Sequence, residues 1–302
     1  MVPMNFTPRE RLLEHRERTA LPLSLNNARQ LGGIALPGGR RVRGGLLLRT
    51  TRLFDASEED LRLLRERYHL SLILDMRGES EISRAPDPEI PGAKWVHTDI
   101  IDFDFLRQNL LARAQGHAAS LLDRPDAPGG ERMLDWMIET AREGARLGRS
   151  DLGLGSAYAA YLESALGREK LGLFFHELAA NERGAALWHC HTGKDRTGIA
   201  AGLILEVLGA DWDTIAADYE TSNLYYEEDV AALARRLREK GVEEAIFPPV
   251  CGFVGVHLPM LENAWKYMAR DWGGPIGYLT RACGVTEGEL AALRERYIED
   301  EA

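Results

Sequence analysis

Two short, almost entirely apolar runs constrain the fold of this chain more than any other feature of its sequence. They cover residues 70–75 and 185–190, and each ends in polar side chains: Asp75 in the first run, His189 and Cys190 in the second. Runs of this length without alternation between apolar and polar residues are typical of strands covered on both faces. Residues 46–49 and 95–100 fit further strands, and helical patterns separate these segments. The sequence therefore predicts an α/β fold, with a central, mostly parallel sheet flanked by helices.

The helical patterns indicate one continuous domain. Thr7, Pro8 and Glu10 together predict a capped first helix. Residues 104–150 have a helical pattern but contain a break rich in proline and glycine, which predicts a helical insertion. No boundary divides the chain, so residues 1–302 are expected to form a single domain. Further helices are expected over residues 57–68, 157–178, 197–208, 212–219, 227–240, 259–271 and 286–298.

Composition and charge exclude several classes of protein. The formal net charge of −10 argues against general binding of nucleic acids, which requires a basic face. No run approaches the ~18 apolar residues that a membrane span requires. The first residues lack the pattern of a secretory signal, so a cytoplasmic protein without an integral membrane segment is expected. The three cysteines are too few and too scattered for a disulfide framework or a metal cluster, and Cys251 and Cys283 are predicted to be buried and unreactive.

The second apolar run leads into the sequence His-Cys-His-Thr-Gly-Lys-Asp-Arg-Thr-Gly at residues 189–198. This segment lies between a predicted strand and a predicted helix, which is where open α/β sheets bind their ligands. A loop that leads into a helix directs several backbone N–H groups, and the positive end of the helix dipole, towards one point. Gly193 and Gly198 permit tight turns and close backbone approach there. The segment therefore predicts an anion site.

Cys190 is expected to be an activated nucleophile in such a loop, because cysteines near helix N-termini and cations are ionised at neutral pH. Arg196 can fold back and present two N–H donors to two oxygens of a phosphoryl group. Donors fixed around the phosphorus stabilise the transition state of phosphoryl transfer. The Thr197 hydroxyl is expected to help the sulfur leave, and His189 to orient the cysteine through hydrogen bonds.

Two other interpretations of this segment compete with an anion site built around a nucleophile. Gly-Lys-Asp is not the loop that binds nucleoside triphosphates, because the glycine required upstream is absent. The second alternative is a buried, inert cysteine beside a solvated Lys-Asp-Arg run. An arginine six residues after a cysteine also arises by chance. The prediction of an anion site therefore depends on the flanking glycines, lysine, aspartate and threonine.

Residues 189–198 closely resemble the active-site loop of the protein tyrosine phosphatase superfamily. The Gly-Lys-Asp-Arg-Thr-Gly form is similar to the atypical bacterial branch of tyrosine and lipid phosphatases, which includes a secreted mycobacterial enzyme. The amino-terminal Asn-Ala-Arg-Gln-Leu-Gly-Gly is similar to the Asn-Phe-Arg-Asp-Leu-Gly-Gly of that family, with Ala28 and Gln30 as departures. The resemblance covers most of the chain, because further segments match at residues 48–50, 75–77, 218–223 and 277–279.

The resemblance implies hydrolysis of a phosphate ester in two displacements, without a cofactor or a metal ion. Cys190 would attack phosphorus to form a phosphocysteine, which water would then hydrolyse. A general acid must protonate the leaving oxygen. In this branch an aspartate inside the loop is implied, which corresponds to Asp195. Asp75 is the rival, although it could instead be an ion-pair partner for Arg77 or Arg49.

The resemblance also assigns supporting positions. The phosphate pocket would be lined by residues 191–194, which are His191, Thr192, Gly193 and Lys194. His191 and Thr192 replace residues that are variable or small in the family. Lys194 would add positive charge at the pocket mouth, as in phosphatases that accept phosphoinositides, or would be a solvated surface lysine. Asp218 and Asn223 would brace the loops around the site, and residues 104–150 would form a lid or a surface insertion without that role.

Three classes of function follow from these patterns. The first is an enzyme whose partner is a phosphorylated protein, with phosphotyrosine as the main substrate and phosphoserine, phosphothreonine or a phosphoinositide as further ones. The second is a module that binds phosphorylated ligands without turnover, which the intact Cys190, Asp195, Arg196 and Thr197 argue against. The third is sulfur or arsenate chemistry. Arsenate reduction would require a resolving cysteine, and no recognisable motif contains one.

Overall fold

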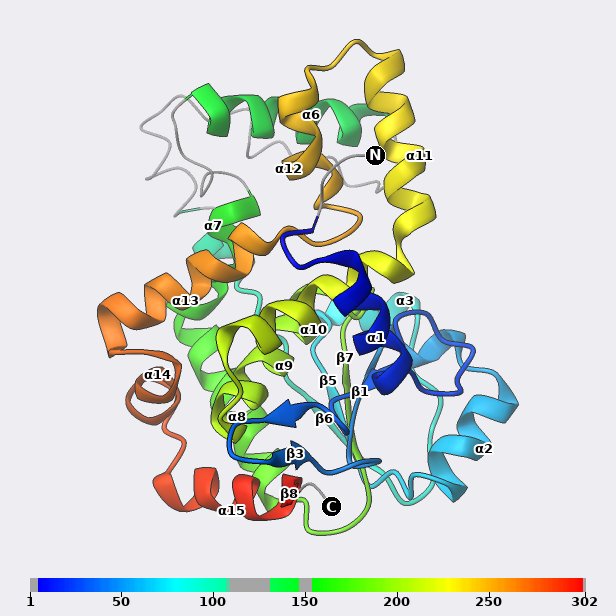
Figure 1. Cartoon of the computed structure of the whole chain (residues 1–302), viewed down its shortest axis with the longest axis vertical. Coiled ribbons are helices and arrows are strands. Elements are labelled where there is room, and N and C mark those ends of the chain that lie inside the picture. The colour runs from blue at the N-terminus through cyan, green and yellow to red at the C-terminus, as the bar shows by residue number, and fades with distance from the viewer. Residues whose placement is uncertain (1–4, 107, 109–130, 147–153, 301–302) are drawn as a thin grey trace.

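The computed structural model describes residues 5–106, 108, 131–146 and 154–300. Its centre is a five-stranded sheet of order β1-β4-β7-β5-β6, in which β1 is antiparallel to β4 and the other neighbours are parallel. The predicted α/β class and the mostly parallel sheet are confirmed (Figure 1). The strands of this sheet are β1 (Arg29–Gln30), β4 (Leu47–Thr50), β5 (Leu72–Asp75), β6 (Lys94–His97) and β7 (Ala186–His189).

The inner strands read as unbroken apolar runs because both of their faces are covered. Every residue of β4, β5 and β7 is buried. Leu74 and Trp188 point into the apolar core on one face of the sheet, whereas Ile73 and Leu187 point into the core on the other face. Successive side chains of a strand alternate between the two faces, and here neither face meets water.

Helices form both covering layers. Phe174 of α8 and Ile199 of α9 belong to the same apolar core as Trp188, and Leu64 of α2 belongs to the core on the opposite face. Figure 1 shows α8 and α9 on one side of the main sheet and α2 on the other. None of the described helices combines the length and the apolar composition that crossing a membrane requires. The described α-helices are α1 (Arg9–Thr19), α2 (Glu58–Glu66), α3 (Glu79–Arg84), α6 (Glu131–Arg146), α7 (Leu154–Glu163), α8 (Ala165–Ala180), α9 (Asp195–Leu208), α10 (Trp212–Tyr225), α11 (Glu227–Glu239), α12 (Phe247–Cys251), α13 (Leu258–Trp272), α14 (Pro275–Arg281) and α15 (Glu287–Tyr297).

A second, smaller sheet joins distant parts of the sequence. It consists of β2 (Ala35–Leu36), β3 (Arg40–Val42) and β8 (Ile298–Asp300), all antiparallel. The last helix was expected to reach residue 298, but it ends at Tyr297 and the chain turns into β8. The pairing partner of β8 lies far away in sequence, so no local pattern could announce this strand.

A separate apolar core lies between α6, α11 and α12. Met137 of α6, Leu237 of α11 and Val250 of α12 belong to this core. Figure 1 shows these three helices together beyond the end of α10, away from the main sheet. Most of the predicted insertion at residues 104–150 lies outside the described residues, and α6 is the long helix that the structure describes within it. We call these helices the α6/α11/α12 layer.

Two helix starts differ from the sequence prediction. Pro8 rather than Thr7 precedes α1, and no side chain caps this helix. The N–H groups of Phe6 and Thr7 instead donate to the carboxylate of Glu220 on α10, both at 2.7 Å. The single helix expected over residues 157–178 is two helices, because the Ser164 side chain accepts from the N–H of Gly167 and caps α8.

Candidate active site

Cys190 lies where the sequence predicted it, directly after β7 and shortly before the first turn of α9. Residues 190–194 form this connection, which we call the Cys190 loop. Its strand, β7, lies between β4 and β5, so the loop emerges at the carboxyl ends of the parallel strands. The Cys190 side chain is buried, with 1% of the residue exposed. The loop therefore places a buried sulfur beside the N-terminus of a buried helix.

Two buried arginines and one aspartate support the Cys190 loop from within the protein. The Asp218 carboxylate of α10 accepts from Arg29 Nε of β1 at 3.0 Å and from Arg49 Nη1 of β4 at 2.6 Å. Arg49 Nη2 donates to the carbonyl oxygen of Gly193 at 2.9 Å. We call Arg29, Arg49 and Asp218 the floor of the site. With two guanidinium groups and one carboxylate, the floor retains an excess positive charge next to the loop.

The charges of the floor depend on one another. Burial and the neighbouring Arg29 lower the pKa of Arg49 to about 10, while Asp218 and the sulfur of Cys190 act in the opposite direction. Burial alone would raise the pKa of Asp218, but Arg29 and Arg49 hold it well below its usual range. Asp218 is therefore ionised at neutral pH, and a negative charge on Cys190 would help to keep Arg49 protonated.

Gly193 is required by the backbone of the loop. Its φ is +64°, and a Cβ on this residue would lie 2.3 Å from the carbonyl oxygen of Thr50. The Gly193 carbonyl oxygen also accepts from Asn27 Nδ2 at 2.8 Å. Any larger residue would push the loop away from β4 and break these contacts. The predicted tight turn at Gly193 is confirmed.

Arg196 lies at the opposite side of the loop, where it is clamped by acidic groups. Its Nη1 and Nη2 donate to the two carboxylate oxygens of Glu81 on α3, at 2.7 and 2.9 Å. Nη1 also donates to the Met76 carbonyl oxygen at 2.8 Å and lies 3.6 Å from Asp99 Oδ1. We call Arg196, Glu81, Asp99 and His191 the mouth of the site.

The mouth groups affect one another's protonation. Burial would lower the pKa of Arg196, but Cys190 and Glu81 raise it, so the guanidinium stays charged. Burial would raise the pKa of Glu81, but Arg196 holds it below its usual range. Burial raises the pKa of Asp99 above its usual range, although Arg196 opposes this. Glu81 is therefore the carboxylate that balances the charge of Arg196.

His191 and Thr192 contact neighbours through their ring and backbone respectively. The half-exposed His191 ring lies 3.2 Å, at Nε2, from Arg52 Nη1. Burial and then Arg52 lower the pKa of His191, so the ring is neutral at pH 7. The Thr192 carbonyl oxygen accepts from the Tyr226 hydroxyl at 2.5 Å.

Asp195 and Lys194 form an ion pair at the start of α9. Lys194 Nζ lies 2.8 Å from Asp195 Oδ2, and only 4% of Lys194 is exposed. The alternative of a solvated surface lysine is therefore wrong. Asp195 Oδ1 also accepts from the hydroxyl of Tyr158, at 2.5 Å.

Asp75 is a partner of Arg77. Asp75 Oδ2 accepts from Arg77 Nη2 at 2.7 Å, and neither side chain is exposed. Burial would raise the pKa of Asp75, but Arg77 lowers it. His189 Nε2 lies 2.9 Å from Asp87 Oδ2, and His189 Nδ1 lies 3.3 Å from the Cys190 carbonyl oxygen. The carboxylates of Asp75 and Asp87 and the imidazole of His189 thus lie close together. Arg77 Nη2 lies 2.8 Å from Asp87 Oδ1, so the guanidinium group supplies the positive charge beside these carboxylates.

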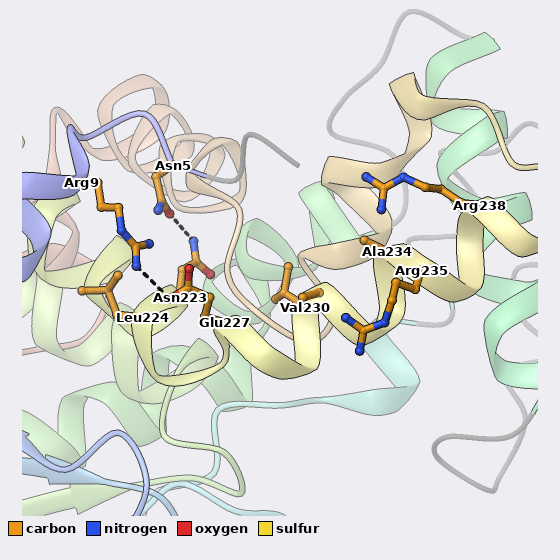
Figure 2. A pocket seen from close by; sticks show the side chains of 10 residues that line it. Asn5, Arg9, Asn223, Leu224, Glu227, Val230, Ala234, Arg235 and Arg238 are labelled. Atoms are coloured by element: carbon orange, nitrogen blue, oxygen red, sulfur yellow. Dashed lines mark hydrogen bonds and ion pairs between the residues drawn. The ribbon is translucent and has the colours of Figure 1, made fainter. Parts of the chain in front are cut away.

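Thr197 and Asn223 differ in their relation to the loop. The Thr197 hydroxyl is buried and has no hydrogen-bond partner within the described part of the chain. Asn223 holds the backbone of Val256, whose N–H donates to Asn223 Oδ1 at 2.7 Å. Asn223 therefore braces the segment before α13, and its bracing of the loops around the site stays a prediction. Asn223 also lines a cavity of about 240 Å³, with Arg9 and α11, to which residues 189–197 contribute nothing (Figure 2).

Comparison with known proteins identifies the family of this chain. Residues 22–299 match the family model described as "Tyrosine phosphatase family". The chain belongs to this family. It is a phosphatase, a hydrolase of phosphoric monoesters.

Three relatives in the tyrosine phosphatase family illustrate the range of similarity. A protein of Cupriavidus necator named "Putative tyrosine-protein phosphatase" is 28% identical over 277 residues, covering 91% of this chain and 86% of its own. A "Tyrosine-protein phosphatase" of Nostoc commune is 34% identical over 145 residues, covering 47% of this chain and 48% of its own. The "Triple specificity protein phosphatase PtpB" of Mycobacterium tuberculosis is 25% identical, covering 86% of this chain and 91% of its own.

Several residues of this phosphatase site were not predicted to take part. They include Arg29, which binds Asp218, Glu81, which binds Arg196, and Tyr158, which contacts Asp195. Arg29 lies in the segment that resembles the family near the amino terminus, so the signal was present but no role was attached to it. Glu81 had only a weak signal in the sequence, namely its position three residues after Gly78. Its carboxylate accepts from the Gly78 N–H there, at the start of α3.

The other two cysteines of this phosphatase are buried, as predicted. Burial raises the pKa of Cys251 to about 11 and that of Cys283 to about 12. Both thiols are therefore protonated at neutral pH, and protonated thiols are poor nucleophiles.

Proposed function

We propose that this phosphatase hydrolyses phosphotyrosine in proteins through a covalent phosphocysteine on Cys190. The observation that carries the proposal is the position of the sulfur, buried in a helix-start loop between the positively charged floor and Arg196. Phosphoserine and phosphothreonine are further substrates. The mycobacterial relative, whose printed name includes "triple specificity", supports this breadth.

In the first displacement, the Cys190 sulfur forms a bond to phosphorus as the bond from phosphorus to the tyrosyl oxygen breaks. Arg196 presents two N–H groups to the equatorial oxygens, where charge accumulates in the transition state. Asp195 transfers a proton to the leaving tyrosyl oxygen. Asp75 is less suited to this step because its side chain is fully buried, whereas 29% of the Asp195 side chain is exposed.

In the second displacement, a water oxygen bonds to phosphorus, and the bond from sulfur to phosphorus breaks to release phosphate. Asp195, now a carboxylate, takes a proton from the attacking water. The departing sulfur regains negative charge and needs a donor. The buried Thr197 hydroxyl, without a partner among the described residues, can supply that hydrogen bond.

We rank two other functions below phosphotyrosine hydrolysis. Phosphoinositide hydrolysis is the second substrate class, and Lys194 is the residue that suggested it. Because Lys194 is paired with Asp195, we place phosphoinositides after phosphotyrosine. Binding of phosphorylated ligands without turnover is the third, and it is disfavoured because Cys190, Asp195 and Arg196 are all present.

We also propose that residues 1–302 form one phosphatase domain, which includes the α6/α11/α12 layer. The family match from residue 22 to residue 299 supports this, because it spans the apolar core beside the main sheet as well as the core of the α6/α11/α12 layer. The direct passage from α10 into α11 supports it as well.

The decisive experiment combines rapid kinetics of an aryl phosphate with the variant Cys190→Ser. We expect a stoichiometric burst of the aryl alcohol from the native protein. The serine variant should lose turnover by roughly 10⁴-fold or more, yet still bind phosphotyrosyl peptide. Cys251→Ser, which alters another buried cysteine, is the matched control and should retain both burst and turnover. Undiminished hydrolysis by Cys190→Ser would contradict the mechanism, and a panel of phosphopeptides and phosphoinositides would rank the substrates.

A further inference from the structure

A pair of buried tyrosines lies next to Asp195. Tyr158 of α7 donates its hydroxyl to Asp195 Oδ1 at 2.5 Å, and its hydroxyl oxygen lies 3.0 Å from that of Tyr219 on α10. Each tyrosine is 1% exposed. The two rings meet edge to face, with their centroids 6.3 Å apart and their planes at 88°. Three separate helices, α7, α9 and α10, therefore meet at one carboxylate.

Gly198 of the active-site sequence makes room for this pair. A Cβ on Gly198 would lie 3.0 Å from a ring carbon of Tyr219. Gly198 lies inside α9, where it provides the close backbone approach that the sequence predicted rather than a turn. The absence of a side chain lets the Tyr219 ring approach the helix closely. The segment at residues 195–198 thus contains both the carboxylate of Asp195 and, at Gly198, the space into which the Tyr219 ring fits.

Both phenols act as donors and keep their protons. Burial, and then the nearby Asp195, raises the pKa of Tyr158 well above its usual value, and the same causes raise the pKa of Tyr219. A phenol that stays protonated cannot transfer a proton during the reaction. Since the Tyr158 proton is directed at Asp195, the Tyr219 hydroxyl is left to donate to the Tyr158 oxygen. The pair is therefore a chain of two hydrogen bonds that ends on Asp195.

Lys194 and Tyr158 restrain Asp195 in different ways. Lys194 Nζ lies 3.0 and 2.8 Å from the two carboxylate oxygens, but an ammonium group is a point charge on a flexible stem and imposes little direction. The ring of Tyr158 is packed in the core, between Tyr219 and a stacked Tyr161 whose centroid lies 6.0 Å away. Its hydroxyl consequently points in one direction, and that direction is towards Oδ1 of Asp195.

We propose that Tyr158 is the positioning residue for Asp195 and that Tyr219 fixes the Tyr158 hydroxyl. This inference rests on the proposed function, in which Asp195 protonates the leaving group. Tyr158 holds the Asp195 carboxyl group in the orientation needed for proton transfer. It does not touch the substrate.

The test is Tyr158→Phe, measured as kcat/KM over a series of aryl phosphates with good and poor leaving groups. For the poorest leaving groups, which depend most on the acid, we expect a loss on the order of tenfold. For the best leaving groups we expect a loss of less than about twofold, because they depart without protonation. KM for these substrates should stay within about twofold, because Tyr158 does not touch the substrate and its loss should fall on kcat. Tyr219→Phe should show the same pattern at smaller size.

Tyr278→Phe is the matched control, because Tyr278 is fully buried in the same core and donates its hydroxyl to Leu162, away from Asp195. Its kcat/KM should not depend on the leaving group more than in the native protein. An equal loss of kcat/KM on all leaving groups in Tyr158→Phe would overturn the inference. The proposed function would fail differently, through the absence of a burst in the native protein or full activity of Cys190→Ser.

Discussion

The floor and the mouth of the site each contain buried arginine, but they use it differently. In the floor, Arg29 and Arg49 share one carboxylate, Asp218, and all three residues are buried completely or almost so. In the mouth, a single arginine, Arg196, is clamped by Glu81, whose side chain is 26% exposed. The floor therefore has surplus positive charge, whereas the mouth has its positive charge balanced.

This difference assigns a separate task to each region. Buried positive charge would stabilise a negatively charged sulfur on Cys190, and Arg49 holds the loop backbone through the carbonyl oxygen of Gly193. Balanced charge near the surface keeps Arg196 oriented until a phosphate group arrives. We therefore expect changes in the floor to be seen mainly in stability, and changes in the mouth mainly in catalysis.

The largest effect should come from breaking the floor with Asp218→Asn. This variant leaves two buried guanidinium groups without their shared countercharge, and we expect the free energy of unfolding to fall by about 3–5 kcal/mol. Urea denaturation at pH 7 measures this. Because the folded protein lowers the pKa of Asp218, its contribution is complete above the ordinary carboxyl pKa and is lost only as the pH falls through the lowered value. The difference in the free energy of unfolding between Asp218→Asn and the native protein should therefore become smaller only in strong acid.

The control for this variant is Asp213→Asn, on the same helix. The Asp213 side chain is 76% exposed, and its partner Arg11 lies 3.9 Å away. Its unfolding free energy should stay within about 0.5 kcal/mol of the native value. If the two variants were equally stable, the floor would not be a buried charge network in the sense described above.

The next largest effect should come from Arg196→Lys, which keeps the charge of the mouth but removes its two-pronged donor. We expect kcat/KM to fall by about 10²–10³-fold, because a lysine cannot bind two phosphoryl oxygens in the same way. The free energy of unfolding should change by only about 1 kcal/mol. Arg52→Lys, a neighbouring arginine beside His191, should stay within about twofold in kcat/KM. A large loss of stability with little loss of activity would reverse the assigned roles.

The smallest effect should come from Glu81→Gln, which frees Arg196 without removing it. The loss of a negative charge beside the phosphate site should lower KM for an aryl phosphate, and the loss of orientation should lower kcat, each by roughly threefold to tenfold. Steady-state kinetics separates the two. Glu79→Gln, an exposed acid on the same short helix, is the matched control and should change neither. A raised KM would show that Glu81 does not compete with the substrate for Arg196.

The sequence alone determined the α/β class, the central strands, and the place of Cys190 in a loop between β7 and α9, with Arg196 at the start of that helix. These features follow from local physics. An unbroken apolar run requires a strand buried on both faces, and a short loop with Gly193 before an apolar helix creates an anion site. The identity of each residue and its near neighbours was enough.

Only the tertiary structure decided which charges meet. Arg29 and Asp218 are 189 positions apart in the chain, and Glu81 and Arg196 are 115 apart. They meet because β4, β7 and β5 lie side by side and end at one edge of the sheet, with α3 and α10 packed around that edge. A single sequence records the hydrophobic pattern of each strand but not the order of the strands. The residues that contact Asp218, Arg196 and Asp195 could therefore be identified only from the three-dimensional structure.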